Sequence, residues 1–82
     1  GFMVRMKVSR NSSLSVIIDD AASQGYDLTS GDLIEWKASR TIALDLTDAG
    51  SVEIELNGKP IKLQVPAGKP AYVILDANGI KQ

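Results

Sequence analysis

The sequence SVEIELNGKPIKL, from Ser51 to Leu63, predicts a β-hairpin. Apolar and polar residues alternate on both sides of Asn57-Gly58, and Asn-Gly is the strongest short signal for a two-residue type I′ turn. Both central residues of that turn need a positive φ, which glycine adopts freely and asparagine more readily than most residues. The turn sets the register, so we expect five cross-strand pairs: Leu56–Lys59, Glu55–Pro60, Ile54–Ile61, Glu53–Lys62 and Val52–Leu63.

This register gives the hairpin one apolar and one polar face. Pro60 occupies a non-hydrogen-bonded pair, where the ladder needs no N–H from it. Glu53 and Lys62 form an opposite-charge pair on the polar face. The apolar face consists of Val52, Ile54, Ile61 and Leu63.

Alternation and turn residues recur along the rest of the chain and predict further short strands. These cover residues 2–9, 13–19, 24–28, 33–38, 40–46 and 71–76, and a Pro- and Gly-rich connection spans 64–70. We interpret residues 19–23 as a turn, with a short helix over 19–24 as the weaker alternative. The inward face of strand 71–76 stays open, because Tyr72 and Ile74 compete with Val73 and Leu75. The inward residues of the earlier strands are Phe2, Val4, Met6, Val8, Leu14, Val16, Ile18, Tyr26, Leu28, Ile34, Trp36, Ala38, Ile42, Leu44 and Leu46.

About 7–8 short strands with turn signals every 8–12 residues or so predict an all-β fold. The expected architecture is a small antiparallel β-sandwich, immunoglobulin-like or Greek-key. With 82 residues, 44% of them hydrophobic, the chain fits a single globular β domain over residues 1–82. Residues 1–2, Gly1-Phe2 ahead of Met3, are a candidate cloning scar, so the natural protein could be longer. Residues 76–82 are expected to form a loose turn and tail.

Composition excludes several function classes. The net charge is −1 and there is no basic block, so we expect no nucleic-acid binding by this domain. The chain has no Cys, hence no disulfide framework and no thiolate zinc site. It has no His, which removes Ser-His-Asp and Cys-His nucleophile systems. No apolar run approaches the roughly 18 residues of a membrane span, and no signal peptide is visible.

Paired carboxylates are the remaining route to catalysis, since two acids can act as general acid and base. We interpret each pair as structural, in a turn or on a solvent face. Residues 45–50 begin like a calcium-binding loop, but Leu56 stands where a bidentate Glu is needed. We therefore assign no catalytic, metal-binding or cofactor-binding residue. The acid pairs considered are Asp19 with Asp20, Asp45 with Asp48, and Glu53 with Glu55.

Aromatic and apolar residues offer two kinds of binding surface. Trp36, Tyr26 and Tyr72 could form a sugar platform, although Trp36 alternates with core residues and is expected to be buried. A partner protein could instead add a strand to an exposed sheet edge, which Pro60 and Pro70 would blunt. The other candidate is an apolar face that carries Ile17 with Tyr26 or Tyr72.

Three turns in order carry a family resemblance. Ser30-Gly31-Asp32 precedes a strand with an aromatic residue, Thr47-Asp48-Ala49-Gly50 follows, and residues 52–60 read Val-x-Ile-x-Leu-Asn-Gly-Lys-Pro. This order resembles the C-terminal domain of the RodZ family, with its Gly-Glu turn, Gly-Asn-Ala-Gly turn and Val-x-Val-x-Val-Asn-Gly-Lys-Pro hairpin, over roughly Met6 to Leu75. The chain departs from the family at Thr47-Asp48, where Gly-Asn is usual, and at Leu14, where a Ser-Trp-Val motif has Trp.

The resemblance implies a function in bacterial rod-shape maintenance and cell-wall elongation. RodZ-like proteins carry a cytoplasmic helix-turn-helix domain that contacts the actin-like MreB, one transmembrane helix, a linker and then this β domain in the periplasm. The chain would be the extracytoplasmic interaction module of a single-pass inner-membrane protein, without enzyme activity. Its partners would be envelope or wall-elongation proteins, and it would meet the membrane only through a helix outside this chain. The alternatives are a carbohydrate- or peptidoglycan-binding module and an accessory domain of a larger envelope enzyme.

Overall fold

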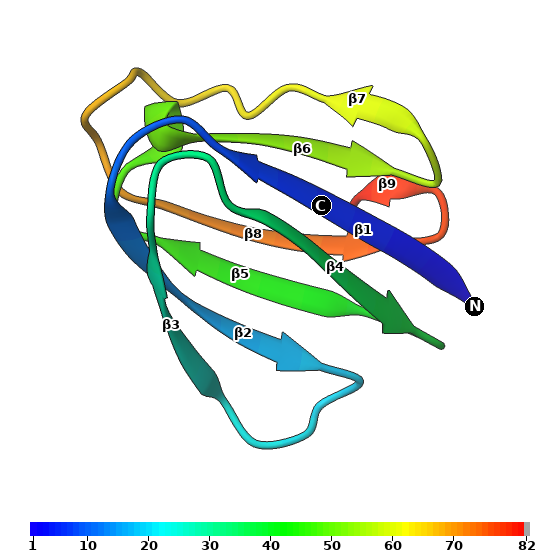
Figure 1. Cartoon of the computed structure of the whole chain (residues 1–82). Helices are drawn as coiled ribbons and strands as arrows, with labels where there is room; N and C mark the ends of the chain where they lie inside the picture. Colours follow the sequence, from blue (N-terminus) through cyan, green and yellow to red (C-terminus); the bar gives the residue numbers. More distant parts are fainter. Residues whose placement is uncertain (82) are drawn as a thin grey trace.

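The computed structural model describes residues 1–81, and it places nine strands of this part of the chain in two antiparallel sheets (Figure 1). One sheet has four strands in the order β4-β1-β6-β7, and the other has five in the order β3-β2-β5-β8-β9. The predicted all-β sandwich is confirmed. The elements are β1 (Phe2–Val8), β2 (Ser12–Ile18), β3 (Gln24–Leu28), β4 (Leu33–Ala38), β5 (Ile42–Leu46), the 3₁₀ turn η1 (Ala49–Ser51), β6 (Val52–Leu56), β7 (Lys59–Ile61), β8 (Ala71–Asp76) and β9 (Gly79–Ile80).

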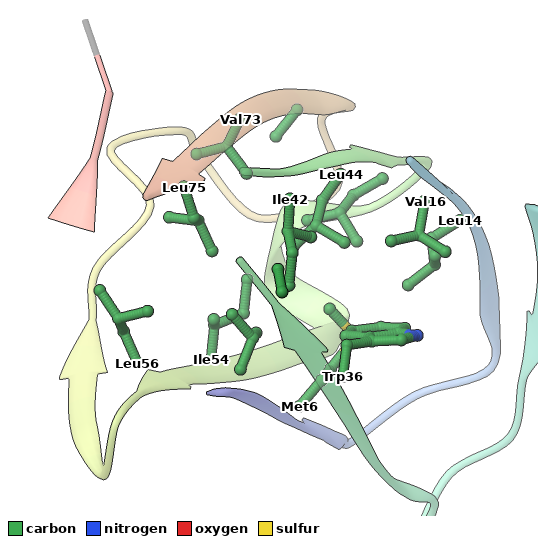
Figure 2. Close-up of a cluster of buried hydrophobic side chains, with 14 of the residues drawn as sticks. Met6, Leu14, Val16, Trp36, Ile42, Leu44, Ile54, Leu56, Val73 and Leu75 are labelled. Atoms are coloured by element: carbon green, nitrogen blue, oxygen red, sulfur yellow. The ribbon is translucent and has the colours of Figure 1, made fainter. Parts of the chain in front are cut away.

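The core lies between the two sheets, because alternate residues of each strand point to opposite faces. Every second residue of β1, from Phe2 to Val8, is buried. In β8 the inward face is the one with Val73 and Leu75, which are buried, whereas Tyr72 is 64% exposed. The two inner faces meet in Figure 2, where Met6, Trp36, Ile54 and Leu56 of the four-stranded sheet lie across from Leu14, Val16, Ile42, Leu44, Val73 and Leu75 of the five-stranded sheet.

The hairpin forms as predicted at its turn but is shorter than predicted. Asn57 and Gly58 have φ values of 50° and 84°, as a type I′ turn requires. The three pairs nearest the turn, from Leu56–Lys59 to Ile54–Ile61, are confirmed. The pairs Glu53–Lys62 and Val52–Leu63 are wrong, because β7 ends at Ile61 and the chain then crosses to the other sheet.

The C-terminal end is more ordered than the expected loose tail. The carboxylate of Asp76 accepts the N–H of Asn78 at 2.8 Å, which stabilises a two-residue turn between Asp76 and Gly79. Gly79 and Ile80 then pair with β8 as strand β9, and the Lys81 N–H donates to Ile74 O at 2.7 Å. The expected turn over Asp76–Gly79 is confirmed, whereas the expected loose tail was wrong for Ile80 and Lys81. Gln82 lies outside the described residues.

Candidate functional site

The first acid pair belongs to a turn and not to a catalytic site. Asp19 and Asp20 have φ values of 51° and 61°, and the Ala21 N–H donates to Ile18 O, so β2 ends in a tight turn and the helical alternative is excluded. The Asp19 carboxylate accepts three backbone N–H groups of the turn between β4 and β5. Their donors are Ser39 at 2.9 Å, Arg40 at 2.7 Å and Thr41 at 3.1 Å.

Asp48 connects three segments of the chain. Its Oδ1 accepts the N–H groups of Gly50 at 2.9 Å and Gly68 at 2.8 Å, and its Oδ2 accepts from Arg10 at 3.0 Å. The neighbouring Ala49 N–H donates to Lys69 O at 2.9 Å. Asp48 therefore holds the connection between β7 and β8 against the start of η1, and its carboxylate is occupied by structural donors.

These two carboxylates predict an acid-sensitive fold. Donation from Ser39 and Arg40 lowers the pKa of Asp19 below its ordinary 3.8, and donation from Gly68 and Gly50, with Arg10 nearby, lowers the pKa of Asp48 in the same way. A lowered pKa in the folded state adds stability that is complete above the unfolded pKa and is lost as pH falls through the folded pKa. We expect the free energy of unfolding to fall below about pH 4, with a shallower dependence in D19N and D48N, as urea titrations from pH 7 to pH 2 would measure. An unchanged slope in both D19N and D48N would contradict the assignment.

The other candidate acids lie on solvent-facing strand positions. Glu53 and Glu55 stand opposite Lys7 and Arg5 of β1. Asp45 lies between Ser15 and Tyr72 in the five-stranded sheet. Within residues 1–81, no group of three acidic side chains is arranged as a metal site, and none of the helical structure there is long and apolar enough to cross a membrane.

The three aromatic residues considered as a sugar platform do not form one. Trp36 is 5% exposed and packs edge-on against Tyr26, with ring centroids 5.9 Å apart and planes at 75°. Tyr26 is half-buried at that position. Tyr72 belongs to β8 and faces solvent on the outside of the five-stranded sheet. The predicted burial of Trp36 is confirmed.

The outer face of the five-stranded sheet brings Ile17 and Tyr72 together, one of the two pairs predicted for an apolar face. In the β2-β5-β8 register, Ile17 stands beside Ala43, and Ala43 beside Ile74. The next row contains Ser15, Asp45 and Tyr72. Ile17 and Tyr72 therefore share a face, whereas Tyr26 points to the inside of the sandwich and does not join them. We call this surface the outer β2-β5-β8 face; it consists of Ser13, Ser15, Ile17, Ala43, Asp45, Tyr72, Ile74 and Asp76.

The opposite surface of the sandwich has a different character. On the outer face of the four-stranded sheet, Arg5 of β1 forms an ion pair with Glu35 of β4 at 3.1 Å. Lys7 of the same strand stands opposite Glu53 of β6. Arg5 and Lys7 are thus matched by acids on neighbouring strands, whereas Lys37 of β4 stands opposite Met3.

Comparisons with protein-family models, with curated proteins and with solved structures find no match for this chain. The candidate site therefore rests on the geometry described above. The sequence analysis did not predict that the Asp48 carboxylate bonds to Gly50, Gly68 and Arg10. Asp48 two residues before Gly50 is a signal for a local Asx turn, but no local signal points to Gly68 or Arg10 as further partners.

Proposed function

We propose that this chain is a non-catalytic interaction module, the extracytoplasmic β domain of a RodZ-like protein that acts in rod-shape maintenance and cell-wall elongation. In this proposal the domain lies in the periplasm, belongs to a single-pass inner-membrane protein and contacts envelope or wall-elongation proteins. The membrane helix and the cytoplasmic helix-turn-helix domain belong to segments outside this chain.

The observation that supports the proposal most directly is that the residues of the resemblance occupy turns in the expected order. Gly31, with a φ of 96°, lies in the turn before β4. Asp48 caps η1, and Asn57-Gly58 forms the type I′ turn between β6 and β7. Each motif thus supplies the residue that a turn between two strands requires, either a glycine at positive φ or an aspartate that accepts backbone N–H groups.

The gene upstream of the codon for Met3 tests this proposal. We expect an apolar run of roughly 20 residues, flanked by Lys and Arg on its cytoplasmic side. A helix-turn-helix pattern should precede it. An unrelated catalytic domain upstream, or a start codon without a membrane segment, would overturn the RodZ-like assignment.

The carbohydrate-binding alternative makes a separate prediction about Trp36. Because this side chain is 5% exposed, soluble peptidoglycan fragments should leave its fluorescence unchanged. A fluorescence titration with muropeptides measures this, and free tryptophan in the same buffer corrects for absorption by the ligand. Saturable quenching would favour the alternative and count against the proposed function.

A further inference from the structure

Charge is distributed unequally between the two sheets. The strands of the five-stranded sheet contain no Lys or Arg. The strands of the four-stranded sheet contain four basic and three acidic residues. The acidic residues of the five-stranded sheet are Asp27, Asp45 and Asp76, and none of them forms an ion pair with a described side chain.

The outer β2-β5-β8 face combines this negative charge with an apolar centre. Ile17, Ala43 and Ile74 form a continuous row across three strands, and all three are partly exposed. Tyr72 adds an aromatic ring that is 64% exposed beside the row. Small residues such as Ser13 and Ser15 fill outward positions of β2, and Lys81, whose N–H donates to Ile74 O, adjoins the β8 end of the row. An apolar, aromatic centre with a polar rim is the composition of a protein-protein contact.

We propose that the outer β2-β5-β8 face docks a basic protein surface, in which apolar side chains are flanked by Lys or Arg. The apolar side chains would cover the row from Ile17 to Ile74 and contact the ring of Tyr72. The cations would pair with Asp45 and Asp76, whose carboxylates are free of cationic partners within residues 1–81. The inference rests on the proposed function as an interaction module and adds the chemistry of the partner.

A second copy of the chain is a poorer occupant than a basic partner. The opposite face carries Arg5, Lys7 and Lys37, but Glu35 holds Arg5 in an ion pair, and Glu55 and Glu53 stand opposite Arg5 and Lys7. Its three acids therefore balance its three cations. Docking that face against the acidic one would bring its three glutamates toward Asp45 and Asp76. Such a contact would also be head-to-tail and would not close into a dimer.

The test uses the whole chain, labelled with ¹⁵N, and a defined probe. The probe is a cyclised hairpin peptide that presents Val side chains flanked by Lys, and the control peptide has Glu in place of each Lys. We expect saturable amide shifts confined to β2, β5 and β8 with the Lys peptide, weakening with salt, and none with the Glu peptide. Shifts on β1, β4 and β6, equal binding of both peptides or no shifts at all would overturn the docking proposal.

Matched charge reversals locate the contact. D45K places a cation in the proposed contact and should weaken binding of the Lys peptide at least about tenfold. Y72A, at an exposed position, should weaken binding as well. E35K makes the same change on the opposite face and should leave the affinity within about twofold. Equal weakening by D45K and E35K would show a nonspecific charge effect and overturn the proposal, whereas the RodZ-like assignment is decided independently by the upstream gene.

Discussion

Replacing Trp36 by alanine should remove about 3–5 kcal/mol from the free energy of unfolding. Trp36 is 5% exposed and packs against Tyr26 and the core between the sheets, so the shorter side chain leaves a large cavity. A domain of 82 residues has a total stability of roughly 4–12 kcal/mol, so W36A should lose about a quarter of its stability or more. Urea unfolding followed by circular dichroism measures this effect.

Two further variants separate the size of the side chain from its polar atom. Trp36 Nε1 is buried without a hydrogen-bond acceptor in the described part of the chain, and a buried unpaired donor costs about 1–3 kcal/mol. W36F removes that donor and keeps an aromatic ring, so it should cost much less than W36A. Y72A is the exposed control and should stay within about 0.5 kcal/mol of the wild type. Equal losses in W36A and W36F would contradict this account of the site.

Replacing Gly50 by alanine should cost about 1–3 kcal/mol through overpacking. An added Cβ would lie 2.5 Å from the Cβ of Ala67 and 2.8 Å from Nη2 of Arg10. The connection between β7 and β8 would have to move, which weakens the bond from the Gly68 N–H to Asp48. Urea unfolding measures the loss, and faster hydrogen exchange at Gly68 locates it.

The control for this variant is a glycine with free space around it. A Cβ added to Gly25 meets no atom within 4 Å, and its φ is not positive, so G25A should be neutral or stabilising. The double variant G50A/A67G removes the closest contact and should recover part of the loss. No recovery in the double variant, together with unchanged exchange at Gly68, would show that the connection is not what G50A disturbs.

Local patterns predicted the parts of this fold that depend on neighbours along the chain. Alternation identified the buried face of β1, and Asn57-Gly58 identified the hairpin turn with its first three pairs. The pair Val52–Leu63 failed because β7 ends at Ile61. The connection that follows is bonded to Asp48 through the Gly68 N–H, a contact that no local pattern reveals. Strand β9 was missed because two residues are too few to show a period.

The candidate surface depended on strand order, which the sequence left open. Ile17 and Tyr72 lie far apart along the chain. They share a face because β2 and β8 both pair with β5 in the same sheet, in a register that points both side chains outward. Both Tyr26 and Tyr72 fitted the apolar pattern. The structure distinguishes them, because Tyr26 points toward Trp36 between the sheets whereas Val73 takes the inward position beside Tyr72.

The central position of β1 has a consequence for synthesis of the protein. Among the strands of this domain β1 is made before the others, yet both of its neighbours in the sheet, β4 and β6, are made later. Val4 pairs with Leu56, 52 residues further along. At about 5–20 residues per second, the ribosome needs roughly 3–10 s to make that stretch. Until β4 is made, the apolar side of β1, from Phe2 to Val8, has no strand from its own sheet beside it, and its second neighbour is missing until β6 follows. The newest chains are therefore the ones that most need protection from aggregation.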